Sequence, residues 1–203
     1  MADISNKTLA LVLVAALAVS LVGTLLSMNR LNTLTGFATS TGTSNLTLVS
    51  TSAISFAINN VDWGTGSVNA SDVTHNYTCT LDTLGTKTGC VNFTTVTQGL
   101  VLENTGDTNL NVTLKSDKTP TQFIGTGATF QWKIAENETG SCNGTLGQTT
   151  FTTVSTTDTN ICTVLLPQIA TNSLKIDLNV TIPLAVMSGG AGAKLATLTA
   201  TGN

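Results

Sequence analysis

The chain has 203 residues, which is enough for one domain of ordinary size and one additional helix. Only 9% of the residues are charged, against roughly 25% in a typical soluble protein, and the formal net charge is −3. The 8 Lys and Arg residues are scattered along the chain, so we do not expect a nucleic-acid-binding surface.

The first predicted element is a long apolar helix at the N-terminus, assigned to residues 1–35. Residues 8–28 carry no charge and are long enough to cross the roughly 30 Å hydrocarbon core of a bilayer. The apolar pattern continues past Arg30, which predicts about 26 helical residues and a stop at Gly36. A removable secretory signal has a shorter apolar core of roughly 7–15 residues, so a membrane span is favoured over simple removal.

Small residues are distributed among the leucines and valines of this helix, namely Ala15, Ala16, Ala18, Ser20 and Gly23. Such residues let helix backbones approach each other closely, which favours helix–helix packing over a plain anchor. The predicted assembly residues are Leu9, Leu11, Val12, Leu13, Val14, Ala16, Leu17, Val19, Leu21, Val22, Leu25 and Leu26.

Residues 36–44 are small and polar, and they predict a connector to a second domain over residues 45–203. In that domain the apolar pattern changes to the period of two that strands have. Residues 45–50 and 53–59 predict the first strands. Residues 99–116 hold two alternating stretches around the turn ENTGDTN, which predicts a β-hairpin.

Further strands are predicted at residues 129–135, 173–186 and 194–202. The second of these is the longest alternating stretch, and Pro183 near its end indicates a sheet edge or a bulge. About nine to eleven short strands separated by turns are typical of an antiparallel sandwich. The predicted fold class is therefore mainly β with one long N-terminal α-helix, the β domain being an immunoglobulin-like β-sandwich.

The 4 cysteines, Cys79, Cys90, Cys142 and Cys162, all lie outside the apolar helix. In an extracellular protein an even number of cysteines indicates disulfides. Three pairings are possible, and we favour the local one, Cys79 with Cys90 and Cys142 with Cys162. A structural zinc site is disfavoured because there is no C-x-x-C pair and His75 is the one histidine.

The β domain contains many N-x-Ser/Thr motifs, which are acceptors for N-glycosylation in secreted proteins. A composition rich in Thr and Ser also produces such motifs by chance. A nearly uncharged surface dense in them is nevertheless what a glycan-coated extracellular protein shows. The predicted sites are Asn45, Asn69, Asn76, Asn92, Asn111, Asn137, Asn143 and Asn179.

We expect no enzyme activity and no cofactor. His75 lies in a polar loop, the acidic residues are spread singly, and no phosphate-binding or nucleophile motif occurs. Glu136 and Glu138 are close enough to share a calcium ion, but a solvated turn is the favoured interpretation. Trp63 and Trp132 are interpreted as packing residues, and the few other aromatic side chains do not favour a carbohydrate-binding module.

The layout resembles archaeal surface-filament subunits of the type IV pilin and archaellin kind. The resemblance is carried by the apolar helix over residues 8–34, the joint at Gly36 and the Thr-rich strands from Asn45 onward. Residues 100–116 and 192–202 also look like the strand-turn-strand and closing strand of archaeal immunoglobulin-like surface domains. In that family the helices bundle in the filament core and glycosylated β domains lie outside.

The resemblance implies a structural subunit that waits in the membrane and then polymerises with copies of itself outside the cell. Cell surfaces and glycans are further candidate partners. The family's leader usually ends in a basic residue followed by Gly or Ala, whereas Asn6 and Lys7 precede Thr8 here. Either the cut falls at a different site or the helix stays as an anchor. The alternative function is therefore a membrane-anchored coat or adhesin that does not polymerise.

Overall fold

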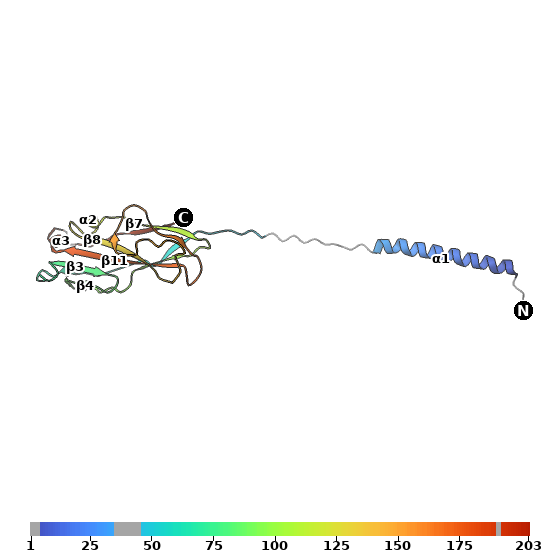
Figure 1. The fold of residues 1–203 in the computed structure, drawn as a ribbon, viewed down its shortest axis with the longest axis horizontal. Coiled ribbons are helices and arrows are strands. Elements are labelled where there is room, and N and C mark those ends of the chain that lie inside the picture. Colours follow the sequence, from blue (N-terminus) through green and yellow to red (C-terminus); the bar gives the residue numbers. More distant parts are fainter. Residues whose placement is uncertain (1–4, 35–45, 190–191) are drawn as a thin grey trace. The chain divides into compact units, whose positions relative to one another are not determined.

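The computed structural model describes residues 5–34, 46–189 and 192–203. The chain divides into two compact units, Met1–Thr47 and Leu48–Asn203. The first unit contains the helix α1 (Asn6–Leu34), drawn in blue in Figure 1. The predicted stop at Gly36, the connector over residues 36–44 and the first residue of the next predicted strand, Asn45, lie outside the described residues.

The second unit is built of short strands and two short helices (Figure 1). Its strands are β1 (Ile54–Ile58), β2 (Ser67–Val68), β3 (Thr78–Asp82), β4 (Lys87–Thr88), β5 (Cys90–Val91), β6 (Leu100–Asn104), β7 (Leu110–Ser116), β8 (Thr129–Glu136), β9 (Thr152–Thr153), β10 (Thr159–Leu165), β11 (Ser173–Pro183) and β12 (Leu198–Gly202). Its helices are α2 (Pro120–Phe123) and α3 (Leu184–Gly189).

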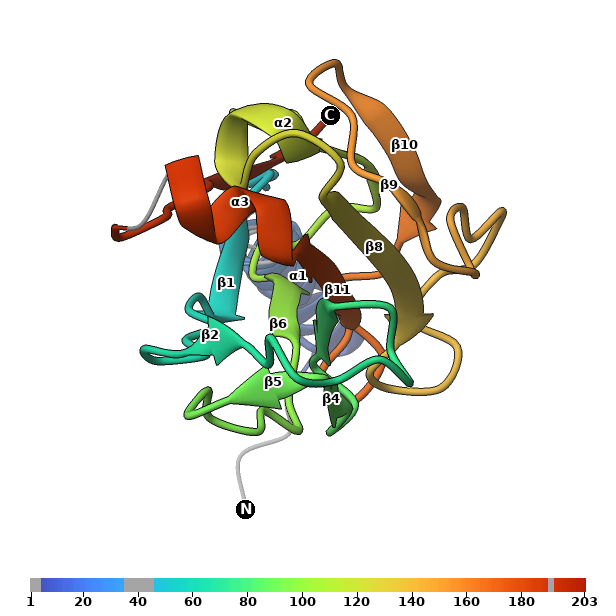
Figure 2. The same cartoon turned by 90° about the vertical axis from the view of Figure 1, so that its left-hand side faces the viewer.

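The main sheet has 7 strands, with β11 at its centre. β8 lies along one edge of β11, while β6 and then β3 pair with successive parts of the other edge. β1 lies outside β6, and Figure 2 shows β1, β6, β11 and β8 side by side. All of these pairings are antiparallel. The longest predicted strand is therefore observed as β11. Its alternating apolar and polar side chains belong to a strand that has neighbouring strands on both sides over most of its length.

A second sheet has 3 strands in the order β10-β7-β12, and β2 and β5 form a small pair. The inward side chains of both larger sheets belong to one hydrophobic core. Trp132 on β8, Leu174 on β11, Val112 on β7 and Ile161 on β10 are each at most 1% exposed. The prediction of mainly antiparallel β structure with one N-terminal apolar helix is confirmed.

The hairpin predicted over residues 99–116 was wrong. Its two stretches form strands, but β6 pairs with β1 and β11 while β7 pairs with β10 and β12. The residues between them carry the chain from one sheet to the other. The sequence pattern misled because each strand alternates correctly for a sheet without showing which sheet it joins.

The sheet edge predicted near Pro183 is confirmed. β8 pairs with β11 only as far as Thr181, whereas Pro183 still lies opposite Thr78 of β3, so the last residues of β11 have a neighbouring strand on one side only. The chain then turns directly into α3, which takes Leu184 out of the predicted strand, and the backbone N–H of Leu184 donates to the carbonyl of Tyr77. Residues 46–50, predicted as a strand, form none.

Candidate functional site: the apolar helix, the glycosylation motifs and an apolar groove

The helix α1 begins at a conventional cap. The hydroxyl of Ser5 accepts a hydrogen bond from the backbone N–H of Lys7 at 3.4 Å, and its carbonyl accepts those of Thr8 and Leu9. Farther along, the hydroxyl of Thr24 donates to the carbonyl of Ser20 at 2.8 Å. That bond satisfies a polar side chain inside the helix itself, which is how such residues are accommodated in an apolar environment.

Apolar side chains surround α1 on every side, without a polar stripe. A helix of this kind needs to be buried in lipid or among other helices. Its large side chains lie in the open within a single chain, from 56% exposed at Val22 to 73% at Val19. The predicted assembly residues that share this exposure are Leu9, Leu11, Val12, Leu13, Val14, Leu17, Val19, Leu21, Val22, Leu25 and Leu26, together with the small Ala16.

Residues Asn6–Met28 of α1 are long and apolar enough to cross a membrane, with a mean hydropathy of 2.7 over the best window. At about 1.5 Å per residue, this stretch extends roughly 34 Å, somewhat more than the hydrocarbon core. Gly23 lies within it, and apart from the adjoining residues and the nearby helix backbone, a Cβ added there would meet no atom of the described residues within 4 Å. The groups available to pack against α1 must therefore come from outside the helix.

Both disulfides have the local pairing favoured by the sequence. Cys79 on β3 joins Cys90 on β5 with an S–S distance of 1.99 Å, and Cys142 joins Cys162 on β10 with one of 2.05 Å. One cysteine of each disulfide, Cys79 and Cys162, is fully buried. Disulfides of this kind persist in oxidising surroundings, so they are consistent with an extracellular domain.

Most of the predicted glycosylation motifs lie on the surface of the β domain. The exposed asparagines are Asn76, Asn92, Asn111, Asn137 and Asn143. Asn69 and Asn179 are half-buried, and Asn45 lies outside the described residues. The exposed positions occur on loops and on the outer side of β7, so attached glycans would spread over several faces of the domain.

Some of these asparagines already make side-chain contacts. The Nδ2 of Asn137 donates to the hydroxyl of Ser173 at 3.0 Å, and the Oδ1 of Asn69 accepts the N–H of Ser71 at 3.0 Å. Asn76 and Asn92 instead have positive φ angles of 51° and 65°, and no side-chain hydrogen bond is observed for either within the described residues. Asn143 is also exposed and has no side-chain hydrogen bond within the described residues, so Asn76, Asn92 and Asn143 are the exposed acceptors whose amides are least engaged by the protein.

No protein-family model, curated protein or solved structure matches this chain. Its function must therefore be argued from its own residues.

The one histidine belongs to an exposed pair. His75 Nδ1 lies 2.7 Å from Asp72 Oδ2, and the side chain of His75 is 43% exposed. The hydrogen bond from the His75 side chain lowers the pKa of Asp72 below its ordinary value of 3.8. The pair closes a turn, because the backbone N–H of His75 also donates to Asp72.

The two acids considered for calcium are engaged by the backbone rather than left in a solvated turn. Glu136 accepts the N–H groups of Gly140 and Cys142 at 2.9 and 3.0 Å. Glu138 accepts the N–H of Asn172 at 2.9 Å. Both carboxylates thus hold the loop that leads into the second disulfide. Among the described residues, no group of three or more His, Cys, Asp or Glu side chains is arranged to hold a metal ion.

A buried carboxylate that the sequence analysis treated as one of several scattered acids lies on β11. Asp177 is 2% exposed and lies 3.0 Å from Lys175 Nζ and 3.6 Å from Lys133 Nζ. It also accepts the hydroxyl of Thr83 at 3.2 Å, and that hydroxyl accepts the N–H of Leu178. This cluster ties β8, β11 and the turn after β3 together, which indicates a structural role.

The sequence analysis also missed a mainly apolar groove with a volume of about 790 Å³, a size within the usual range of ligand sites. Asn59, Asp62 and Lys194 are polar or charged residues in its lining, and we call it the apolar groove. Its floor is the inner side of the main sheet, including Phe130, Leu178 and Val180. Its walls come from segments far apart in the sequence: Phe56 on β1, Val61 and Trp63 in the following loop, Phe93 after β5, Phe123 on α2, Val186 on α3, Ala196 just before β12 and Leu198 at the start of β12.

Local sequence signals position parts of this wall. Thr119 caps α2, because its hydroxyl accepts the N–H of Gln122 while the Gln122 side chain accepts the N–H of Thr119. Pro120 at the first helical position adds to this start signal. The cap orients Phe123, whose ring packs 4.8 Å from that of Phe130. No local pattern, however, indicates that these segments converge.

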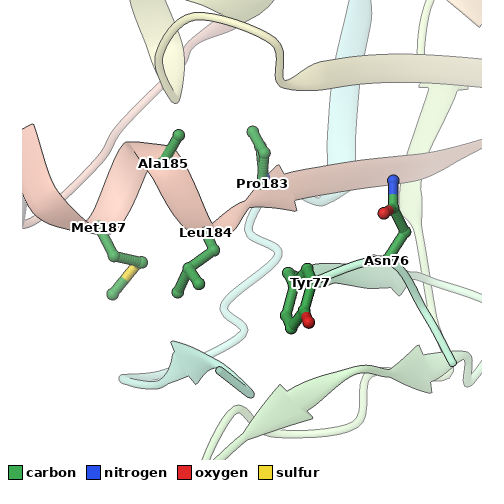
Figure 3. A pocket seen from close by; sticks show the side chains of 6 residues that line it. All are labelled: Asn76, Tyr77, Pro183, Leu184, Ala185 and Met187. Atoms are coloured by element: carbon green, nitrogen blue, oxygen red, sulfur yellow. The ribbon is translucent and has the colours of Figure 1, made fainter. Parts of the chain in front are cut away.

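A second, shallow pocket lies beside the end of β11 (Figure 3). Tyr77, Leu184 and Met187 surround it, and Asn76 lies at the adjoining turn. Its lining is mainly apolar, and Tyr77 is 42% exposed. This pocket is therefore an apolar surface next to a glycosylation motif, without charged groups that would suggest catalysis.

Proposed function

We propose that this protein is the structural subunit of an extracellular filament of the archaeal pilin and archaellin kind. In this proposal α1 lies in the membrane before assembly and in the filament core afterwards. The β domain, an immunoglobulin-like sandwich carrying glycans, forms the outer layer. The protein acts by polymerising and has no catalytic activity.

The observation that carries the proposal is the exposure of α1. About a dozen large apolar side chains lie uncovered on all sides of one helix, and the β domain has its own separate core. Outside a membrane such a helix is stable only when it is buried against similar surfaces, and copies of itself provide them. Each buried Leu or Val contributes roughly 1.5–3 kcal/mol, so a bundle of such helices needs no covalent link.

An asymmetric contact between the α1 helices of two subunits would lead to polymerisation. When one face of a helix packs against a different face of an identical helix, the contact is heterologous and generates a ring or an open helical polymer. An apolar surface that surrounds α1 offers several such faces. The small residues among them, including Gly23, allow close approach of neighbouring backbones.

The outer position of the β domain is supported by its chemistry. Two disulfides and several exposed N-x-Ser/Thr motifs suit a secreted domain in an oxidising environment. Only 9% of the residues of the whole chain are charged, so the β domain also gains from glycans that keep a weakly charged surface hydrated.

The test is electron microscopy of material sheared from cells that make this protein, with mass spectrometry of its N-terminus and glycopeptides. Thin filaments that contain this chain support the proposal, and the N-terminus shows whether cleavage occurs near Lys7. If the chain is found intact in membranes and never in filaments, the proposal fails. The protein is then a membrane-anchored coat or adhesin.

A further inference from the structure

The apolar groove lies between two sheet edges. β1 is the outermost strand of the main sheet on one side, and β12 is an outer strand of the three-stranded sheet. The two strands meet at one end, where a Cβ added to Gly202 would lie 3.2 Å from Ile54 Cγ2. At the other end Phe56 and Leu198 line the groove. The core is therefore open on the side where neither sheet continues.

Incomplete burial is concentrated on this side. The inward residues of β7 are fully buried, whereas Leu198 and Ala200 on the neighbouring β12 are only half-buried. Phe56, Trp63 and Phe93 are likewise half-buried and pack against the core from the groove. An additional strand next to β12 would cover these side chains and extend the three-stranded sheet.

A segment of the same chain has the pattern that such a strand needs. Residues 46–50 (LTLVS) alternate like a strand but form no strand pairing within the part of the chain that the structure describes. Leu46, Leu48 and Val49 are 79%, 85% and 77% exposed. The residues that follow are fixed: the N–H of Asp107 donates to the carbonyl of Thr51, and that of Thr105 donates to the carbonyl of Ala53. The side chains of Leu46, Leu48 and Val49 are exposed, and residues 46–50 are not among those that line the groove.

We propose that residues 46–50 of one copy dock as an extended strand in the groove of a second copy, between β1 and β12. Leu46 and Leu48 point to the same side of a strand, so both enter the groove while Thr47 faces outward. The backbone of the segment pairs with a free sheet edge, and the side chains of Leu46 and Leu48 fill apolar space. In strand addition, backbone hydrogen bonds generally provide affinity and the side-chain pockets provide specificity. This inference rests on the proposed function and adds a second contact between filament subunits.

Cysteine cross-linking tests the contact in assembled filaments. The variant L48C with L198C places one thiol on the docking segment and one in the groove. The control, L48C with T199C, places the second thiol on the exposed face of the same strand. We expect oxidation to give a ladder of covalent multimers at least ten times stronger for the first variant. Intact filaments with no ladder, or with equal ladders, overturn the inference.

A second comparison uses assembly itself. In L46D with L48D, two carboxylates would have to enter the apolar groove, so we expect at least a tenfold loss of filaments. In the control V49D, the carboxylate is on the outward face of the strand, the Asn45 glycosylation motif is kept, and filament yield stays within about twofold of wild type. Equal filament yield and thermal stability in both variants overturn strand docking and leave the filament function standing. Absence of filaments from the wild type overturns both proposals.

Discussion

Asn104, fully buried at the end of β6, donates a hydrogen bond from Nδ2 to the carbonyl oxygen of Leu165 at 3.1 Å. Leu165 ends β10, so this bond joins the two larger sheets at one point. The same amide donates to the carbonyl of Thr108, and its Oδ1 accepts the N–H of Gly106. The side chain thus satisfies two backbone groups of the connection between β6 and β7 and one at the end of β10.

We predict that Asn104→Ala destabilises the β domain by about 2–3 kcal/mol, because it leaves buried backbone groups without partners. For a domain of this size the melting temperature falls by about 4–12 °C. The control is Asn109→Ala, which changes an exposed residue in the same connection. Thermal unfolding followed by circular dichroism compares them, and equal melting temperatures would contradict the role assigned to Asn104.

Asn104 also explains one limit of prediction from sequence. The alternation in β6 and β7 correctly predicted two strands, but their short connection was interpreted as a hairpin turn. One contact that joins the two sheets there, the hydrogen bond from Asn104 to Leu165, involves a residue 61 positions away along the chain, which a local pattern does not reveal. By contrast, β11 was correctly predicted as the longest strand because its side-chain pattern is local to the strand.

The candidate functional features also differ in whether a local sequence pattern predicts them. The apolar helix could be predicted because its composition alone determines its behaviour in water, and the disulfide pairing because short loops close readily. The groove could not, since Phe56, Phe123 and Leu198 meet only after the sheets have formed. Residues 46–50 show the converse: a strand pattern produces a strand only where a partner edge is available.

Two ion-paired sites of the β domain, around Asp177 and around Asp158, provide a comparison between buried and exposed charge. Asp177 is 2% exposed between Lys133 and Lys175, whereas Asp158 and Lys115 are 50% and 40% exposed. Asp177→Ala leaves two lysines and a buried Thr83 hydroxyl without their partner, so we expect a loss of about 2–4 kcal/mol. Asp158→Ala costs about 0–1 kcal/mol. Urea unfolding of the two variants measures the difference, and similar midpoints would contradict this ranking.

The disulfides contribute by restricting the unfolded chain. They link cysteines 11 and 20 residues apart, and chain entropy gives about 3 kcal/mol for each. We expect the double variant Cys142→Ser with Cys162→Ser to lose about 3 kcal/mol and reduction of both bridges to lose about twice that amount. Chemical unfolding with and without a phosphine reductant tests this. An unchanged midpoint after complete reduction would show that the bridges do not stabilise the domain.

The pair formed by Asp72 and His75 predicts a limited pH dependence. The hydrogen bond from His75 lowers the pKa of Asp72 below 3.8 in the folded chain. A lowered pKa means that the folded state binds fewer protons than the unfolded state, so the contribution of this pair to stability is present above about pH 3.8. It is lost as the pH falls through the lower, folded pKa. In His75→Ala the carboxyl of Asp72 should titrate closer to 3.8, as measured by NMR, and no change would contradict the assigned cause.

Substitutions in α1 separate assembly from anchoring. In Leu13→Asp or Ala16→Asp, a carboxylate would be buried in every helix contact of a filament, at a cost of several kcal/mol per subunit. Insertion of one Asp into a membrane costs roughly 2.5–3.5 kcal/mol, which the remaining apolar residues of α1 offset. We therefore expect these chains to stay in the membrane fraction with both disulfides formed, but without filaments.

The matched control is Leu13→Ile, which keeps the volume and the apolar character of the side chain and should assemble normally. Electron microscopy of sheared material and fractionation of the cells supply the two measurements. Normal filaments from either Asp variant would place α1 outside the filament core. If the Asp variants are also lost from the membrane, the step that failed is insertion and not packing between helices. The variant Gly23→Leu then separates these two steps, because it keeps the helix apolar but blocks close approach of neighbouring helices. Membrane insertion without filaments in that variant would show that packing between helices is required.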